Sequence, residues 1–242
     1  ILVASLCFPG PQRSFIFLHW VVWPLGANFS VPEQFGYSPG AARQVDLWTE
    51  SSLRLGAWHV LPASVYRQQV ETANHTDSSR DALYDAALAT HETVLYLHGN
   101  AATRGHYRRV DVCKLTPHMQ RIATDMDANV FVVDYRGFAD SGKCHLLYGT
   151  PSEAGLVEDA ELSWQWLLDH GAPPANITIL GKVGHAADIR ARCTTDTSAS
   201  LGVSPKLLIL KAPFSSIPEL VLEYRILKVL PLFRPLSLLP NS

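Results

Sequence analysis

The chain has 242 residues, which is long enough to bury a sizeable core in one α/β domain. Its formal net charge of −2 offers no basic surface, so we expect no nucleic-acid partner. The four cysteines, Cys7, Cys113, Cys144 and Cys193, are widely spaced without a CxxC pair. This spacing indicates neither a zinc site nor a dense disulfide framework, and nothing in the sequence implies a metal or another cofactor.

The first 43 residues form an apolar arm followed by a loop-like stretch. The arm begins in mid-pattern without Met and includes a second apolar run from Phe15 to Trp23. That run is shorter than the roughly 20 residues of a spanning helix and is interrupted by His19. Its tryptophans favour an interfacial or core-packing segment. We expect this side of the chain to attach to a membrane, with a plain packed arm as the alternative.

A hairpin is predicted next, at the start of a domain that spans residues 44–242. The segments Gln44 to Thr49 and Leu53 to Leu61 alternate apolar and polar residues around a polar turn. The stretch from Ala63 to Thr93 contains the polar run HTDSSRD, so we predict irregular structure there.

Two apolar runs, Val94 to Leu97 and Val130 to Val133, each end in a turn rich in glycine and polar residues. The helix-length segment from Gly105 to Asp127 lies between them. Strand, helix and strand in this order predict a βαβ unit with parallel strands. Ligands bind at the carboxyl ends of such strands, which here run into His98-Gly99-Asn100-Ala101 and Asp134-Tyr135-Arg136-Gly137.

The arginines at the start of the crossover segment, Arg104, Arg108 and Arg109, could hold an anionic head group. Three arginines near a helix start favour a solvated face instead, and that is our prediction. Further along, Ser152 is a predicted helix N-cap, and the helix ends near His170 and Gly171.

After that helix, the sequence predicts buried strands at Ile177 to Leu180 and Leu207 to Leu210. A final helix is predicted from Ser215 through Leu230.

Five blocks occur in a fixed order, LYLHGNAATRG, VVDYRGFADS, GTPSEAGLVEDA, ITILGK and LLILKAPFSSI, with GAWHVLP upstream. They resemble the α/β-hydrolases, and within them the membrane-anchored serine hydrolases that include monoacylglycerol and lysophospholipid lipases. The resemblance implies an α/β fold, with a mostly parallel sheet and helices on both faces, that is incomplete at the C-terminus. It also implies a lipid ester or lipid-like ligand and a membrane-associated location at the endoplasmic reticulum, with the domain on the lumenal side.

In that family a nucleophilic serine occupies the centre of a G-x-S-x-G turn after a buried strand. Here the turn reads Gly181-Lys182-Val183-Gly184, and valine has no nucleophilic atom with which to form an acyl-enzyme. One serine between Lys182 and Val183 would restore the motif, so the loss of a single residue is the simplest explanation. The family's acid and histidine also have no counterpart, since no histidine follows His185. We therefore predict an inactive chain.

The resemblance assigns the oxyanion-binding N–H groups to Asn100 or Ala101, after Gly99, and to Val183. In the alternative interpretation, His98 is a hydrogen-bonded core residue in a tight turn. For Asp134 and Arg136 we expect an ion pair and hydrogen bonds that brace the loops, rather than a catalytic role.

One segment, Lys143 to Tyr148, interrupts the family pattern before Gly149. It is interpreted as an inserted surface loop or a misread segment. Two alternatives to a hydrolase fragment remain open. One is a non-catalytic pseudohydrolase that serves as a lipid-binding or protein-binding scaffold, and the other is a mis-spliced product without a stable fold. The sequence does not indicate an oligomeric state.

Overall fold

The fold is taken from a computed structural model that describes residues 14, 17–20, 22, 26–71, 77–99, 102–105, 118–144, 147–181, 204–210, 225–226 and 230–231. Only the backbone is described for 69–71, 77–79, 143–144, 147–148, 225–226 and 230–231.

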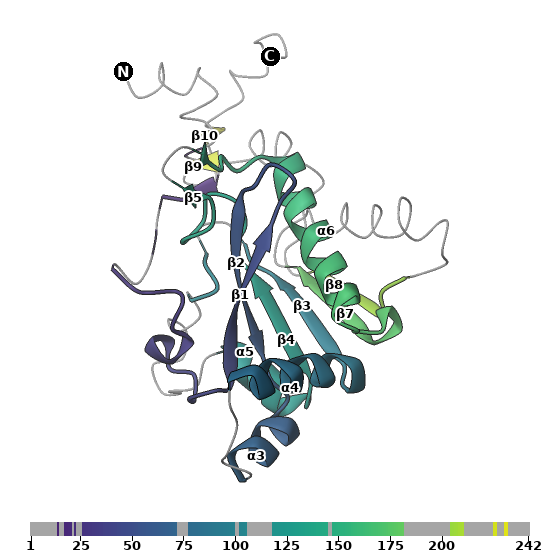
Figure 1. Cartoon of the computed structure of the whole chain (residues 1–242). Helices are drawn as coiled ribbons and strands as arrows, with labels where there is room; N and C mark the ends of the chain where they lie inside the picture. The colour runs from purple at the N-terminus through teal and green to yellow at the C-terminus, as the bar shows by residue number, and fades with distance from the viewer. Residues whose placement is uncertain are drawn as a thin grey trace.

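A six-stranded sheet organises the molecule (Figure 1). Its members are β1 (Ala42–Trp48), β2 (Arg54–Val60), β3 (Thr93–Leu97), β4 (Asn129–Val133), β7 (Ile177–Gly181) and β8 (Leu207–Leu210). The spatial order is β1-β2-β4-β3-β7-β8. Strand β2 is antiparallel to both of its neighbours, and β4, β3, β7 and β8 are parallel. The predicted hairpin, βαβ unit and mostly parallel sheet are confirmed.

The described helices are η1 (Pro32–Phe35), α3 (Ala63–Glu71), α4 (Asp77–Thr90), α5 (His118–Asp125), α6 (Glu153–Asp169) and η3 (Pro174–Asn176). The irregular structure predicted between Ala63 and Thr93 is wrong, because α3 and α4 occupy most of that stretch. Tyr84, Ala87 and Leu88 are buried at the spacing of one helix face. The polar start of α4 hid this apolar face from the sequence analysis.

Two small hairpins complete the described structure. Strands β5 (Lys143–Cys144) and β6 (Leu147–Tyr148) pair within the segment that interrupts the family pattern. Strands β9 (Arg225–Ile226) and β10 (Leu230–Pro231) also pair antiparallel. The helix predicted through Leu230 is therefore wrong over its last residues.

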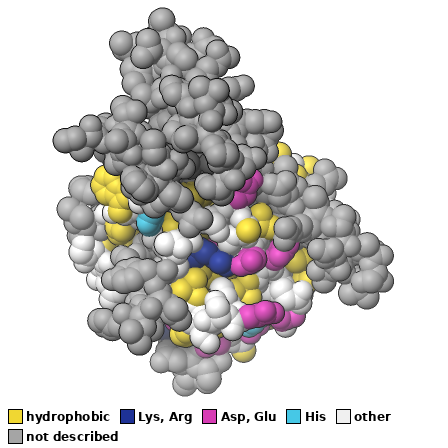
Figure 2. Space-filling model, turned by 90° about the horizontal axis from the view of Figure 1, so that it is seen from above, with side chains coloured by type: hydrophobic (Ala, Val, Ile, Leu, Met, Phe, Trp, Pro, Cys, Tyr) yellow, Lys and Arg dark blue, Asp and Glu magenta, His cyan; other side chains and the backbone are white. Residues whose placement is uncertain are grey.

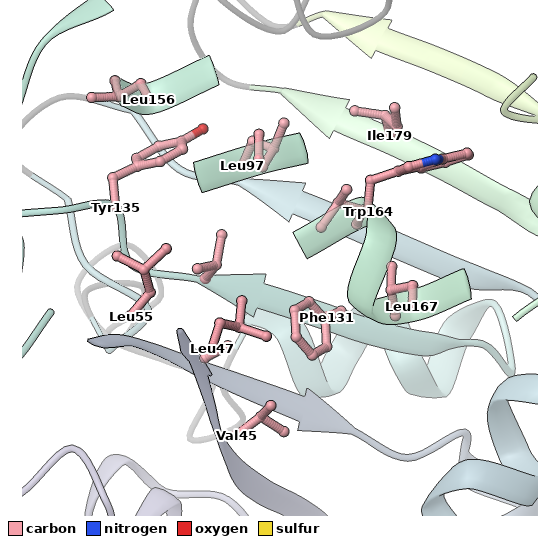
Figure 3. Close-up of a cluster of buried hydrophobic side chains, with 14 of the residues drawn as sticks. Val45, Leu47, Leu55, Leu97, Phe131, Tyr135, Leu156, Trp164, Leu167 and Ile179 are labelled. Carbon is pink, nitrogen blue, oxygen red and sulfur yellow. The ribbon is translucent and has the colours of Figure 1, made fainter. Parts of the chain in front are cut away.

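Helices cover both faces of the sheet, because alternate residues of each strand face opposite sides. Phe131 and Val133 of β4 lie in a core with residues of α6. Val130 and Val132 lie in a second core with residues of α5. Figure 3 shows the first core, where Trp164 and Leu167 of α6 lie over Phe131 and Ile179. The predicted fold class is confirmed.

Helix α6 has the predicted ends. The Ser152 hydroxyl accepts a hydrogen bond from the Gly155 N–H at 3.1 Å, which satisfies one donor of the first turn. After the C-cap His170, Gly171 adopts a φ of 90°, a left-handed conformation that glycine tolerates.

Part of the N-terminal arm packs on the domain. Phe17 is buried in the same core as Leu97, and the His19 ring lies edge-on to Phe138 with centroids 6.2 Å apart. No helix within the described residues is both long enough and apolar enough to span a bilayer. Four of the nine residues of the run from Phe15 to Trp23, on which the expected membrane attachment rests, lie outside the described residues.

Candidate functional site

Three neighbouring strands end at the same edge of the sheet. Leu97, the last residue of β3, pairs with Val133 of β4 on one side and with Gly181 of β7 on the other. The turns that begin at His98 and Asp134, and the segment that follows Gly181, therefore start side by side. This carboxyl edge is where parallel α/β sheets bind ligands.

The turn after β3 is closed by hydrogen bonds around Gly99. The Gly99 carbonyl oxygen accepts the Ala102 N–H at 3.2 Å and lies 2.9 Å from Nδ1 of His98. The His98 ring is buried, and its Nε2 lies 3.4 Å from the Tyr135 N–H donor. A neutral ring with the proton on Nδ1 satisfies both contacts. The predicted oxyanion donors Asn100 and Ala101 lie outside the described residues.

Asp134 begins the turn after β4 and is fully buried. Its Oδ1 accepts the Arg104 N–H at 2.6 Å, and its Oδ2 accepts Nη1 of Arg104 at 2.5 Å. Nε2 of His98 approaches Oδ1 to 3.5 Å. Burial raises the pKa of Asp134 above its ordinary value, and the charge of Arg104 opposes that rise.

Arg104 is not part of a solvated face, so the prediction is wrong for this residue, while Arg108 and Arg109 lie outside the described residues. The Arg104 side chain is 1% exposed, and it forms a buried ion pair with Asp134. It also donates to both carboxylate oxygens of Asp140, at 2.6 and 3.1 Å. The sequence analysis missed this role because both acids lie at least 30 residues away. A carboxylate directly after the apolar run Val130 to Val133 was the available signal that a cation must be nearby.

Asp140 joins a second cation to this network. Arg54 of β2 donates to Asp140 Oδ2 at 3.3 Å and also pairs with Asp46 at 2.9 Å. Burial raises the pKa of Asp140, but the hydrogen bonds and charges of Arg104 and Arg54 outweigh that effect and lower it overall.

Ser141 is the serine of the turn after β4, and its hydroxyl is fully used by the backbone. It donates to the Asp134 carbonyl oxygen at 2.7 Å and accepts the Gly56 N–H at 2.9 Å. The side chain is buried, so it ties β2 to this turn and is not presented to a ligand.

Arg136 connects the same turn to α6. Its backbone N–H donates to Asp159 at 2.8 Å, and its Nε and Nη2 donate to the other carboxylate oxygen at 3.0 and 2.8 Å. Nη2 also reaches Glu158 at 2.9 Å. Asp134 and Arg136 thus each form an ion pair, but with Arg104 and Asp159 as the respective partners.

The degenerate elbow starts at Gly181, which is buried as the last residue of β7. Lys182, Val183 and Gly184 lie outside the described residues, so the predicted positions of the elbow and of its N–H donor stay predictions. In the part of the chain that the structure describes, no cluster of three or more His, Cys, Asp or Glu residues could hold a metal ion.

Paired charges also occur at the surface of the domain. Figure 2 looks down on the molecule from the top of Figure 1 and shows basic side chains beside acidic ones, with hydrophobic side chains nearby. Elsewhere on the domain, Arg43 forms ion pairs with the exposed acids Asp81 and Asp85.

The chain is similar to curated lipases over most of its length. It is 29% identical over 222 residues to the lysophosphatidylserine lipase ABHD12 of Danio rerio and 31% identical over 220 residues to that of Macaca fascicularis. These alignments cover 90% and 89% of this chain and 50% and 48% of the relatives. The chain thus spans about half the length of the curated relatives that it matches.

A more distant relative is the human protein ABHD12B, 29% identical over 187 residues, or 76% of this chain and 44% of that protein. Among solved structures, a bacterial heroin esterase aligns with a TM-score of 0.46 and 16% identity, over 88% of this chain and 53% of that chain. No protein-family model matches the chain.

The fold and the sequence similarity agree. The mostly parallel sheet has helices on both faces. Within the described residues, the blocks of sequence named above fall on strands β3, β4, β7 and β8, on the turns after β3 and β4, and on the first part of α6. The curated relatives carry the name of lysophospholipid lipases. The predicted resemblance is thereby confirmed: this chain has the α/β-hydrolase fold and resembles the lipid-ester hydrolases of that superfamily.

Proposed function

We propose that this chain binds a lysophospholipid-like ester at the carboxyl edge of its sheet and does not cleave it by the serine route. One observation carries the proposal. Gly181 pairs with Leu97, so the elbow segment that follows Gly181 begins next to the turn formed by His98 and Gly99. In the sequence of that segment, Val183 occupies the expected serine position. Without a hydroxyl, sulfhydryl or amine at that position no acyl-enzyme forms there.

Without a nucleophile, the carboxyl edge of the sheet can bind an ester but cannot cleave it by the serine route. In an ester hydrolase, N–H groups of the oxyanion site stabilise the negative oxygen that forms when the nucleophile attacks, and one such donor contributes about 3 kcal/mol. When no nucleophile attacks, the same N–H groups meet only the neutral ester carbonyl. We place these donors after Gly99 and at Val183. A neutral carbonyl is a weaker acceptor, so the expected result is reversible binding of the intact ester.

Three described polar residues near the edge, Asp134, Asp159 and Ser141, support this reading because each has a structural partner. Asp134 is paired with Arg104, and Asp159 is paired with Arg136. The Ser141 hydroxyl is held by two backbone groups. None of these three side chains is available as a substitute nucleophile.

A direct test uses the purified chain and a fluorophosphonate ester probe, which labels activated serines. We expect no labelling, with a lysophosphatidylserine lipase relative labelled in parallel as the positive control. In the same preparation, lysophosphatidylserine is expected to raise the melting midpoint, since a ligand that binds only the folded state stabilises it. Strong labelling would refute the absence of a nucleophile. A broad thermal unfolding transition with a midpoint that does not change when the lipid is added would indicate a product without a stable fold.

A chain with one serine inserted between Lys182 and Val183 tests the elbow itself. The 242 residues given contain no histidine after His185, so we expect a variant made of these residues alone to show no ester turnover. An alanine insertion at the same point is the matched control for the change in turn length. Measurable turnover with serine and none with alanine would show that serine alone had been missing.

We extend the proposal to location, with the N-terminal arm at a membrane and the domain on the lumenal side of the endoplasmic reticulum. The triplets at Asn28, Asn74 and Asn176 would be glycosylation acceptors on that side. Expression in mammalian cells followed by glycosidase treatment should increase the gel mobility. A chain that is expressed, is membrane-bound and carries no glycan would contradict the lumenal placement.

A further inference from the structure

We propose that Arg104 is the positioning residue of this edge: it fixes the turn after β3, which contains His98 and Gly99, against the turn after β4. This inference concerns the same edge as the proposed function and rests on it only for the identity of the ligand. Arg104 lies two residues beyond Ala102, whose N–H closes the turn on the Gly99 carbonyl oxygen. A change in the position of the Arg104 backbone is therefore expected to shift the turn that contains His98 and Gly99.

The contacts of Arg104 join four separate segments of the chain. Its backbone N–H and Nη1 bind Asp134, and both of its terminal nitrogens bind Asp140. Nη2 also donates to Gln44 Oε1 of β1 at 3.2 Å and lies 3.4 Å from the Phe29 carbonyl oxygen. A guanidinium is planar with donors in a rigid fork, so these acceptors together fix its position and its orientation.

The surroundings leave the guanidinium little freedom. Its central carbon lies 4.9 Å from the ring centroid of Phe29 and 5.2 Å from that of Trp58. On another side it passes close to the backbone of β2. A Cβ added at Gly56 would lie 2.7 Å from Nη1 and 2.8 Å from the Asp140 carboxylate. Glycine within this strand is thus explained by the close approach of a charged pair.

Charge balance explains why the network can be buried. Arg104 faces two carboxylates, and Arg54 supplies a second cation to Asp140. Asp140 therefore keeps a cation if Arg104 is lost, whereas Asp134 would keep the backbone N–H of residue 104 and His98, at 3.5 Å, but no arginine. A stabilising role and a positioning role can be separated on this basis, because a variant that removes the charges of Arg104 and Asp134 together leaves no unpaired charge.

The experiment compares Arg104→Met, the double variant Arg104→Met with Asp134→Asn, and Gly56→Ala. Two readouts are used: the melting midpoint, and the NMR signals of the His98 ring and the Gly99 amide. We expect the double variant to recover most of the midpoint lost in Arg104→Met while the His98 and Gly99 signals stay displaced. Gly56→Ala is expected to displace the same signals with every charge still present. Arg43→Met is the matched control, since Arg43 also binds two acids, Asp81 and Asp85 of α4.

Wild-type His98 and Gly99 signals in Gly56→Ala, which keeps every charge and the contact between Asp134 and His98, would overturn the proposal and leave Arg104 a stabilising role only. If Arg104→Met does not fold, the NMR signals of the double variant and of Gly56→Ala still test the positioning role. Affinity for lysophosphatidylserine is measured in parallel, and a loss of about tenfold is expected in the double variant. If the unmodified chain binds no lipid, the proposed function fails, but the NMR signals still test Arg104 because they require no ligand.

Discussion

The two ends of the parallel strands bury polar groups in different ways. The carboxyl edge holds Arg104 and Asp134, an ion pair with both side chains inaccessible to solvent. The opposite, amino edge holds His59 and Asn129, which are equally buried and are joined by a hydrogen bond of 2.9 Å. One edge is built from full charges, and the other from a hydrogen bond between neutral groups. The carboxyl edge can therefore be broken by removing one charge, whereas the amino edge is sensitive to added protons.

The neutral edge has a defined proton arrangement. The Asn129 amide NH₂ donates to the Ala87 carbonyl oxygen at 2.8 Å, so its Oδ1 is the atom that accepts from Nε2 of His59. Nδ1 of His59 has no hydrogen-bond partner among the described residues. A proton added there would place a buried charge without an acceptor. Burial, with a smaller contribution from the charge of Arg43, accordingly lowers the pKa of His59 to about 3.

The two edges should respond to acid in opposite directions. Burial raises the pKa of Asp134, so its ionised form costs stability above its ordinary pKa and protonation relieves that cost as the pH falls. Burial lowers the pKa of His59, so the unfolded chain takes up a proton that the folded chain refuses between pH 6.5 and about 3. Acid therefore weakens the amino edge.

The largest expected effect is at the charged edge. Arg104→Met leaves the buried carboxylate of Asp134 without its guanidinium partner and should lower the free energy of unfolding by about 3–5 kcal/mol, measured by urea denaturation. The control is Asp81→Asn, which removes an exposed partner of Arg43 and should cost about 0–1 kcal/mol. Equal losses in the two variants would show that the buried pair is no more sensitive than a surface pair.

A smaller loss is expected when the neutral edge is broken. Asn129→Ala leaves the Ala87 carbonyl oxygen and Nε2 of His59 without their bonds to this side chain, so we expect a loss of about 1–3 kcal/mol in the free energy of unfolding. Gln120→Ala, which removes a side chain hydrogen-bonded to Ser38, is the control and should cost less. A loss in Asn129→Ala above that in Arg104→Met would invert the comparison of the two edges.

The pH dependence gives a third test. Below pH 6.5 the proton refused by His59 should reduce the free energy of unfolding by up to about 1.4 kcal/mol per pH unit. Urea titrations at pH 7, 6 and 5 measure this slope. In His59→Gln the contribution should disappear, and in His91→Gln it should persist. An unchanged slope in His59→Gln would mean that other groups cause the acid sensitivity.

The smallest effect is expected next to the charged edge but outside its network. Ser152→Ala removes the acceptor for the Gly155 N–H at the start of α6 and should cost about 1 kcal/mol. Ser152→Asp keeps an acceptor and should preserve stability. If Ser152→Ala costs as much as Arg104→Met, substitutions anywhere near the carboxyl edge are destabilising and the cost is not specific to the buried pair.

Sequence patterns predicted elements wherever apolar residues recur with a clear period. The hairpin of β1 and β2, strands β3, β4, β7 and β8, and both ends of α6 agree with the structure. Helices α3 and α4 were missed because HTDSSRD interrupts the pattern, although Tyr84, Ala87 and Leu88 carry the period of a helix. Sequence periodicity does not reveal a helix when the polar residues of its exposed face far outnumber its buried apolar residues.

By itself, the sequence determined the order of the strands along the chain, the turns after β3 and β4, and the valine at the expected serine position. These features depend on neighbours in the chain, and periodicity and steric rules are local. Only the tertiary structure decided that Arg104 is buried between Asp134 and Asp140, and that His59 is neutral beside Asn129. A charged or titratable group depends on partners that folding brings from tens of residues away, because burial makes such a partner obligatory and no local pattern specifies which residue supplies it.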